Sequence, residues 1–484
     1  LNVDSLYDVQ KQMNQQQMAF SDFMQTAAAQ RQLEQIASVQ SAVETQMEKA
    51  ELGRDTTYTY ASLLSGFATR VRYGDIAKIR ELSGVRDVVI SVTYEKEETE
   101  YFPNEGVDNA TYPAGASYAN TSDYRGEGML IGILDTGLDT NHEAFANAPA
   151  VQKLQKSALE KLLYTTEEVD GKINVTAYSY AALWYAQNKS TSTQLNLLTA
   201  DMLYQSGKVP FAFDYADADA DVIPSADAVT KYGNDHGTHV AGIAAGKTVD
   251  ADGNVTFAGQ APEAQLAIFK VFSDSTSGAS TDKILAALND ALLLDVDVIN
   301  MSLGSSGGFS REEDTSAVAK YYDLVKAGGI LLNVSAGNAY SSSWGGANGD
   351  YASTSDPDTG IVGSPSSYDA SLTVASVNTA ASAAFRTEAG RVPYNDVSGH
   401  DFAALLLGEE STKSFEYVVV GGTGDTADYE GLDVTGKIAL VQRGGLSFEQ
   451  KQLNAAAAGA VACVIYNNLD GYLLNMSVTD YQIP

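Results

Sequence analysis

Two short stretches of this chain contain residue types that can carry out nucleophilic catalysis on a carbonyl. The first, Leu130–Gly137, is an apolar run that ends in an acid, Asp135, and a small turn. The second, Asn234–Gly242, holds two of the four histidines in the chain, His236 and His239. A carboxylate that accepts the N–H of a histidine fixes its tautomer and stabilises the imidazolium formed during catalysis. The pattern predicts that Asp135 orients His236 and that His236 acts as a general base.

The elements that must position these residues form an alternating pattern between about residues 128 and 378. The expected strands are Met129–Leu134, Leu266–Val271, Val296–Met301, Ile330–Val334 and Leu372–Val377, and the clearest helix is Thr281–Leu294. Alternation of this kind predicts an α/β fold, a parallel sheet flanked by helices on both faces. Asp135 then lies at the carboxyl edge of the sheet, where open α/β folds place their sites. His236 is expected to start a helix capped by Asn234 or Asp235.

On these motifs the chain resembles the subtilisin-like serine peptidases, from about residue 57 to its end. The phrases Asn141–Phe145 and Lys437–Gly444 fit a subgroup, the large bacterial cell-envelope proteinases that include lactocepin-like enzymes and complement peptidases. The resemblance implies a secreted or cell-wall-associated serine endopeptidase that acts on proteins or peptides. It implies no required cofactor, and structural calcium is compatible with it.

The resemblance also assigns two substrate-contacting segments. Ser302-Leu303-Gly304 ends a buried strand, and in the family this segment pairs with the substrate backbone and walls the pocket for the residue before the cut. Ser335-Ala336-Gly337-Asn338 follows the next strand and resembles the oxyanion site. Asn338 is expected to donate its side-chain N–H to the developing oxyanion.

The nucleophilic serine of the triad is missing from residues 1–484. The family presents it in a Gly-Thr-Ser motif at a helix start, and no such string occurs here. The nearest serine-rich loop, Gly363–Ser367, precedes a strand and is rejected. Because the subtilisin order is Asp, His, Ser, the serine is expected beyond Pro484, and residues 1–484 alone are expected to be inactive. The alternative is a catalytically inactive surface-binding protein that retains the fold. Absence of the Gly-Thr-Ser motif from the sequence past Pro484 would favour this alternative.

Four regions are expected along the chain. They are a helical Gln-rich leader (1–50), an inhibitor-type propeptide (51–100), the catalytic core (101–390, incomplete, with an insertion at about 147–213) and a β-rich protease-associated domain (391–484, incomplete). In the propeptide, Phe67–Val71 is an expected strand, Asp75 an expected helix cap and Val85–Val92 a β-branched strand, followed by an exposed linker from Glu95. The resemblance implies that this region is an intramolecular inhibitor whose C-terminal part occupies the substrate groove.

Composition narrows the function classes further. The net charge of −32 and the pI of about 4.3 argue against nucleic acid as a partner. No apolar run approaches the length that spans a bilayer, so no transmembrane segment is expected. The alternating acids of Asp214–Asp221 are compatible with a solvated acidic loop or with oxygen ligands for calcium. Ala144 stands where many compact subtilisins have an acidic ligand, so that calcium site is in doubt.

Overall fold

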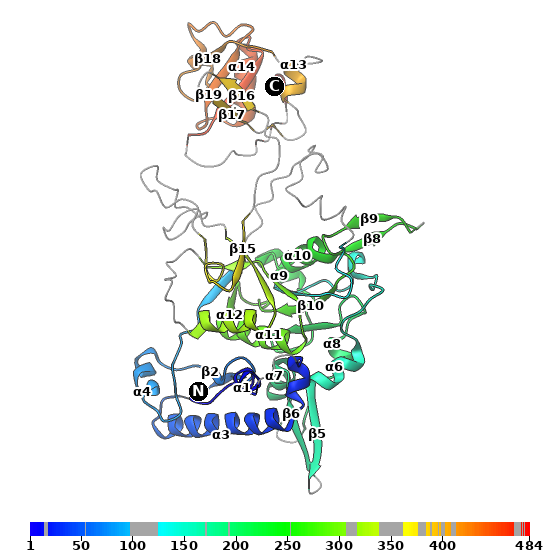
Figure 1. Cartoon of the computed structure of the whole chain (residues 1–484). Helices are drawn as coiled ribbons and strands as arrows, with labels where there is room; N and C mark the ends of the chain where they lie inside the picture. The colour runs from blue at the N-terminus through cyan, green and yellow to red at the C-terminus, as the bar shows by residue number, and fades with distance from the viewer. Residues whose placement is uncertain are drawn as a thin grey trace. The chain divides into compact units, whose positions relative to one another are not determined.

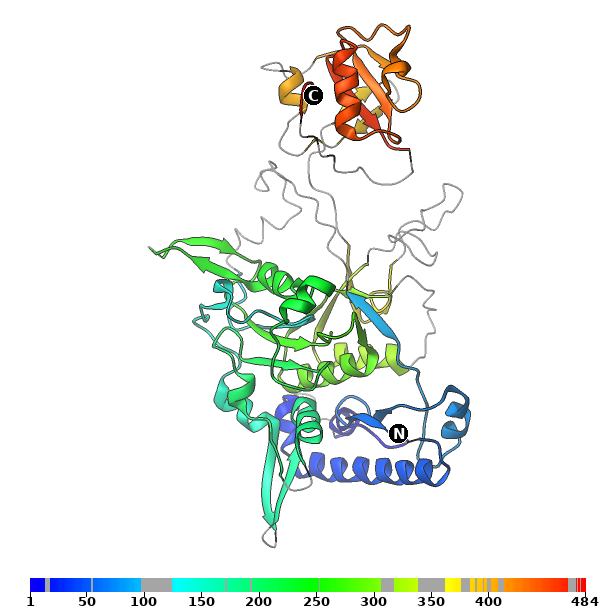
Figure 2. The ribbon, with the colours of Figure 1, turned by 180° about the vertical axis from the view of Figure 1, so that it is seen from behind.

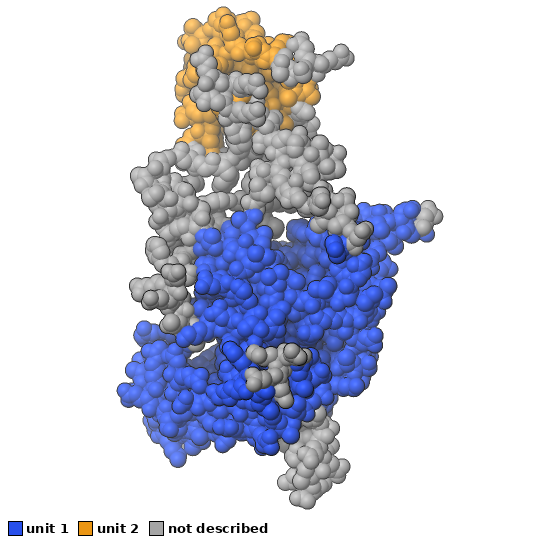
Figure 3. Space-filling model, in the orientation of Figure 1, with its two compact units in different colours: residues 1–99, 115–345, 360–376 blue, residues 100–114, 346–359, 377–484 orange. Residues whose placement is uncertain are grey.

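The computed structural model describes two compact units, which are coloured separately in Figure 3. Unit 1 comprises residues 1–99, 115–345 and 360–376, and unit 2 comprises residues 100–114, 346–359 and 377–484. The described residues are 1–13, 18–53, 55–96, 124–169, 172–191, 194–251, 253–305, 317–337, 362–375, 384–387, 390–394, 396–397, 402–407, 413–468, 476, 478 and 480–484.

Unit 1 is built on a six-stranded sheet in which every pair of neighbouring strands is parallel. In spatial order the strands are β15 (Ser371–Val374), β14 (Leu331–Ser335), β12 (Val298–Met301), β4 (Leu130–Asp135), β10 (Gln265–Lys270) and β7 (Phe211–Asp214). Five of these strands were predicted from the apolar runs, and the expected fold class is confirmed. The sixth, β7, lies at the end of the segment that the sequence assigned to the insertion.

Helices cover both faces of this sheet, as Figures 1 and 2 show from opposite sides. Alternate residues of β4 and β10 point to opposite faces, which produces two separate apolar clusters. Ile133 and Ile268 pack with α10 (His236–Ala245) on one face. Leu134 and Phe269 pack on the other face, in the cluster that includes residues of α11 (Thr281–Leu293) and α12 (Ala317–Ala327). The central strands β4 and β10 are therefore covered on both faces, as is usual in parallel sheets.

Residues 1–96, called the N-terminal segment below, pack against the α11 side of unit 1. The elements are α1 (Leu6–Gln12), α2 (Phe20–Met24), α3 (Ala27–Lys49), β1 (Thr56–Tyr60), β2 (Gly66–Thr69), η1 (Tyr73–Asp75), α4 (Ile76–Arg80) and β3 (Thr93–Lys96). The helical leader and the strand at Phe67 agree with expectation. Two details were wrong. Asp75 makes no side-chain cap and instead binds Lys78 at 2.8 Å, and residues 85–92 form no strand.

After β4 comes η2 (Glu143–Phe145). The expected insertion then contains α6 (Lys156–Leu163), the hairpin β5 (Tyr164–Val169) and β6 (Lys172–Ala177), α7 (Tyr180–Lys189) and α8 (Ala200–Leu203). Then come α9 (Ala226–Tyr232), α10, the hairpin β8 (Lys247–Val249) and β9 (Val255–Ala258), and β11 (Gly278–Ser280). The start of α7 is fixed by the buried carboxylate of Asp290 in α11. It accepts hydrogen bonds from the backbone N–H groups of Tyr180 and Ala181 at 2.7 and 2.8 Å. A carboxylate at a helix N-terminus satisfies donors that the helix leaves unpaired.

Unit 2 contains the three-stranded parallel sheet β18 (Tyr417–Val419), β19 (Ile438–Gln442) and β20 (Ala462–Tyr466), with α14 (Phe448–Ala457) packed on β20. It also holds the hairpin β16 (Ala384–Thr387) and β17 (Gly390–Pro393), α13 (Phe402–Leu407) and η4 (Thr426–Tyr429). These strands agree with the β-rich domain that was expected in this part of the chain. Among the described residues, no helix in either unit is long and apolar enough to cross a membrane.

Candidate active site

The carboxylate of Asp135 lies at the carboxyl end of β4, where only 1% of the residue is exposed. One of its oxygens, Oδ1, accepts a hydrogen bond from the backbone N–H of Thr136 at 2.7 Å. The other, Oδ2, is buried and has no hydrogen-bond partner among the described residues. A carboxylate oxygen can accept more than one hydrogen bond, so Oδ1 can still bind a second N–H donor.

That donor is His236, the first residue of α10, which is 7% exposed. Its Nδ1 lies 2.8 Å from Oδ1 of Asp135. Because a carboxylate only accepts, Nδ1 carries the proton and the lone pair of the neutral ring is on Nε2. The structure thus brings together the acid and the histidine that the sequence paired, in the geometry that a general base at Nε2 requires.

Thr136 joins the two halves of the site. Its hydroxyl donates to the backbone carbonyl of Asn234 at 2.7 Å and accepts from the backbone N–H of Gly237 at 2.9 Å. Asp235, one of the two expected residues, is the N-cap residue of α10, but its side chain makes no cap hydrogen bond. The side-chain amide of Asn234 donates to Ser273 O at 3.3 Å instead of capping the helix. The start of α10 is therefore held by Thr136, a hydroxyl that local helix-start rules do not identify.

Two glycines allow the turn after β4 and the start of α10 to approach each other. A Cβ on Gly237 would lie 2.3 Å from the carbonyl oxygen of Gly137. Gly137 itself has φ of 113°, a left-handed conformation that other residues rarely adopt, and a Cβ there would lie 2.2 Å from Val222 O. Gly237 is thus required by backbone contact between the two loops, and Gly137 by its conformation and by its contact with Val222.

The pKa of His236 results from opposing influences. Burial lowers it, but the hydrogen bond and the negative charge of Asp135 raise it by more, so the pKa lies above the ordinary value of 6.5. The ammonium of Lys96 lowers it and the carboxylate of Asp235 raises it, each by less. The pair therefore favours the imidazolium that forms when His236 takes a proton.

Leu303 and Gly304, assigned to substrate binding, form the strand β13 beside a segment of the chain itself. β3 lies between β11 and β13, antiparallel to both. Lys96 pairs with Leu303, so Ser302 directly precedes the residues of β13 that pair with β3. The expectation of an exposed linker from Glu95 was wrong for its first residues, because Glu95 and Lys96 belong to this central strand.

Ser335 is the last residue of β14, the neighbour of β12 in the main sheet, and Ala336 and Gly337 follow it. This segment is linked to the end of β13, because Ser305 N–H donates to Ser364 O at 2.9 Å and Gly363 N–H donates to Ala336 O at 2.9 Å. The loop rejected as a nucleophile therefore braces these two segments. Asn338, the expected oxyanion donor, lies outside the described residues, and its role stays a prediction.

The acidic run Asp214–Asp221 is neither fully solvated nor arranged as a set of metal ligands. Asp214 is 2% exposed and binds the ammonium of Lys270 at 2.5 Å, whereas Asp221 is exposed. Among the described residues, no group of three or more His, Cys, Asp or Glu side chains is placed to hold a metal ion. Ala144 is buried in the apolar cluster with Phe145.

Comparison with known proteins agrees with this geometry. Residues 126–409 match the subtilase family and residues 413–484 match the PA domain, so the chain belongs to the subtilase family and carries a PA domain. It is 30% identical to a PII-type proteinase of Lacticaseibacillus paracasei and 31% identical to a PI-type proteinase of Lactococcus lactis subsp. cremoris. Each alignment covers 93% of this chain and 22% of the relative. A C5a peptidase of Streptococcus pyogenes is 29% identical over 74% of this chain and 27% of its own length. The chain spans about a fifth of the length of the proteinases it matches.

Proposed function

We propose that this chain supplies the acid and the base of a subtilisin-like serine endopeptidase. The observation that carries the proposal is the 2.8 Å bond between Asp135 and His236 at the carboxyl edge of a parallel sheet, in a chain of the subtilase family. His236 removes a proton from a serine as that serine attacks the peptide carbonyl, and Asp135 holds the ring and stabilises the imidazolium. His236 then returns the proton to the leaving amine. The serine lies outside residues 1–484, and residues 1–484 alone are inactive.

The remaining roles follow from the walls of the site. The Ser302-Leu303-Gly304 segment aligns the peptide by strand pairing, and Ser335-Ala336-Gly337 lies beside it. Asn338 donates to the oxyanion. No cofactor takes part, and any calcium is structural. We further propose that the whole protein is secreted or attached to the cell wall. The match to the lactococcal and lactobacillar proteinases supports this location.

The N-terminal segment has the position expected of an intramolecular inhibitor. β3 fills the space between β11 and β13, so it uses the backbone groups with which a peptide substrate would pair. Tyr94 is 1% exposed, and the ammonium of Lys96 donates to Gly233 O at 2.8 Å. A substrate therefore reaches these edges only after β3 has left.

Contacts away from β3 hold the same segment on the core. The ring of Tyr58 stacks on Trp184 of α7 with centroids 4.5 Å apart, and its hydroxyl donates to Tyr215 O at 2.5 Å. The hydroxyl of Tyr60 donates to Asp282 O at 2.9 Å. These hydrogen bonds join buried groups of the N-terminal segment to groups of the core. They support the proposal that the segment folds together with the core before it is removed.

Processing of the whole protein tests this proposal. In a protein that extends past Pro484 and carries the serine, N-terminal sequencing should place the start of the mature enzyme between residues 97 and 125, because β3 must leave the groove. The His236→Ala variant should keep its original N-terminus if the cleavage is autocatalytic. A fully active mature enzyme that still contains residues 93–96 would contradict the inhibitor role.

A further inference from the structure

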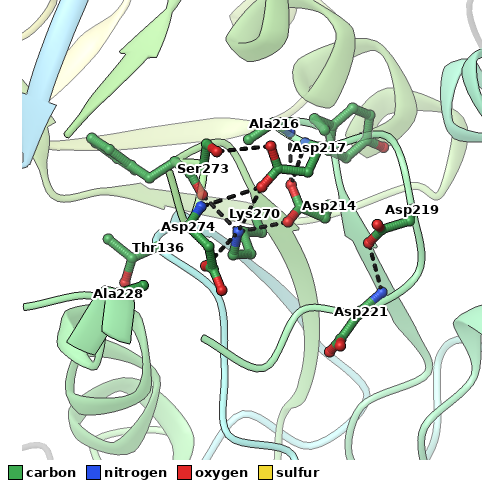
Figure 4. A network of polar contacts seen from close by, with 12 residues as sticks. Thr136, Asp214, Ala216, Asp217, Asp219, Asp221, Ala228, Lys270, Ser273 and Asp274 are labelled. Carbon is green, nitrogen blue, oxygen red and sulfur yellow. Dashed lines mark hydrogen bonds and ion pairs between the residues drawn. The ribbon is translucent and has the colours of Figure 1, made fainter. Parts of the chain in front are cut away.

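A buried lysine next to the candidate catalytic turn has no part in the mechanism above. Lys270, the last residue of β10, is 1% exposed. Its ammonium lies 2.5 Å from Asp214 Oδ2, 3.1 Å from Asp274 Oδ1 and 3.8 Å from Asp217 Oδ2. It also donates to the carbonyl of Phe272 at 2.8 Å. Figure 4 shows this ammonium between carboxylates from two different loops.

These oxygen atoms belong to two separate loops, and the ammonium of Lys270 links the two loops to each other. Asp214 and Asp217 belong to the end of β7 and the turn after it, whereas Asp274 lies in the loop after β10. The loops are also joined directly, since Ser273 Oγ donates to Asp217 Oδ1 at 2.7 Å. A buried charge requires compensation by paired charges and hydrogen bonds, and Lys270 receives both. With the lysine in place these groups are not arranged as metal ligands, but carboxylate and carbonyl oxygens are the donor types that a calcium ion prefers.

The stem of Lys270 supports the turn that carries Asp135. Lys270 is the direct partner of Asp135 in the pairing of β10 with β4. The backbone N–H of the next residue, Val271, donates to Asp135 O at 3.0 Å. A Cβ on Gly137 would lie 2.9 Å from Lys270 Cδ, so the lysine stem packs directly under the turn.

The same loops support the start of α10 from the other side. The carboxylate of Asp217 accepts a hydrogen bond from the hydroxyl of Ser273 and so holds the loop after β10. The backbone carbonyl of Ser273 in turn accepts a hydrogen bond from the side-chain amide of Asn234 at 3.3 Å. The carbonyl of Asn234 in turn accepts the hydroxyl of Thr136 at 2.7 Å. The turn at Asp135 and the start of the helix at His236 are therefore both connected to the loops that surround Lys270.

We infer that Lys270 is a positioning residue for the Asp135–His236 pair, an internal cation that holds the loops at residues 214–217 and 272–274 as a bound calcium ion would. The inference rests on the proposed roles of Asp135 and His236. Its test reads the geometry of that pair and needs neither the serine nor hydrolysis, so the two proposals can fail separately.

A second buried lysine provides a matched control. Lys208 is fully buried near the opposite end of β10, and its ammonium donates only to carbonyls among the described residues, Pro262 O at 2.9 Å and Ala264 O at 2.6 Å. Burial lowers the pKa of Lys208 to about 8. Burial also opposes the charge of Lys270, but Asp214 and Asp274 outweigh it and raise the pKa of Lys270. Of these two lysines, only Lys270 combines burial with carboxylate partners among the described residues.

The experiment is an NMR titration of the chain with labelled histidine, in which the signal of His236 is assigned from the His236→Ala variant. In the parent the pKa of His236 lies above 6.5. In Lys270→Met and Lys270→Ala we expect the Asp135 carboxylate to lose its alignment with Nδ1 of His236, while the His236 ring stays buried. The pKa of His236 should then fall by about one unit, a tenfold change in the protonation equilibrium. Lys208→Met and Lys208→Ala should leave it unchanged. The other charges near His236, Lys96 and Asp235, are the same in every variant.

Calcium chloride then tests the cation role. Lys270→Ala leaves space among the carboxylates, so millimolar calcium should restore the pKa of His236 in a saturable manner. It should have no such effect in Lys270→Met, whose side chain fills that space, or in Lys208→Ala. Circular dichroism shows whether each variant is folded, and Lys270→Met keeps the stem under Gly137 in case Lys270→Ala does not fold. An unchanged pKa in both Lys270 variants, or an equal shift in Lys208→Met, would overturn the inference, as would a folded Lys270→Ala variant that calcium does not restore.

Discussion

Replacing His236 with alanine is expected to abolish peptide hydrolysis by the whole protein, with a loss in turnover of about 10⁶-fold, the magnitude measured for this change in subtilisin itself. In the proposed mechanism the imidazole takes the proton of the attacking serine, and no other histidine contacts Asp135 among the described residues. Its removal leaves only transition-state stabilisation by the rest of the site. Turnover of a chromogenic peptide, measured for the purified variant and its parent, gives the ratio.

His239→Ala is the matched control on the same helix. His239 lies three residues further along α10 and lines a surface pocket with His142 and Phe257, away from Asp135. We expect its change to alter turnover by less than about tenfold, through packing alone. Equal activities of the His236→Ala variant and the parent would refute the assignment of the base.

Asp135→Asn is expected to lower turnover by about 10⁴-fold while leaving the fold in place, by the precedent of the same change in a different serine protease. An asparagine presents an N–H₂ group as well as an oxygen, so it no longer enforces the tautomer with the proton on Nδ1. The pKa of His236 should also fall, because burial is then no longer outweighed by the Asp135 charge. Asp139→Asn, whose carboxylate accepts locally from Asn141 N–H, is the control. A loss of less than tenfold in Asp135→Asn would contradict the orienting role.

The same pair makes a stability contribution with a definite sign. The folded pKa of His236 lies above the unfolded value, so the native state binds this proton more tightly. The resulting stabilisation is fully present below the unfolded value of about 6.5 and is lost as the pH rises through the folded pKa. Thermal melts of the parent and the Asp135→Asn variant across this range should therefore differ less at high pH.

The sequence predicted the elements of the site where local pattern and motif coincide. β4 and β10 are continuous apolar runs, as strands buried on both faces must be, and this places Asp135 at the end of a strand. His236 was identified because its motif also contains the small residues of α10, and Gly237 has a clear steric reason to be small. These features depend on neighbours in the chain and on simple periodicity.

Features that depend on distant partners were missed. The β-branched run at residues 85–92 has high strand propensity, but the strand forms at Thr93–Lys96 because β11 and β13 offer free edges there. Lys270 is a similar case. The acids at residues 214–221 left a solvated loop and a calcium site as the alternatives, and the cation among them is a lysine over fifty residues away. The only sequence signal was a lysine that ends a strand otherwise expected to be buried.

The most direct test of the central claim is labelling with a fluorophosphonate probe, which reacts only with an activated serine. We predict that a protein that extends past Pro484 is labelled on one serine beyond that residue, and that His236→Ala abolishes the labelling. Residues 1–484 alone should remain unlabelled, because they contain the base and its orienting acid without the group that attacks. Stoichiometric labelling of any serine within residues 1–484, located by mass spectrometry, would contradict the account.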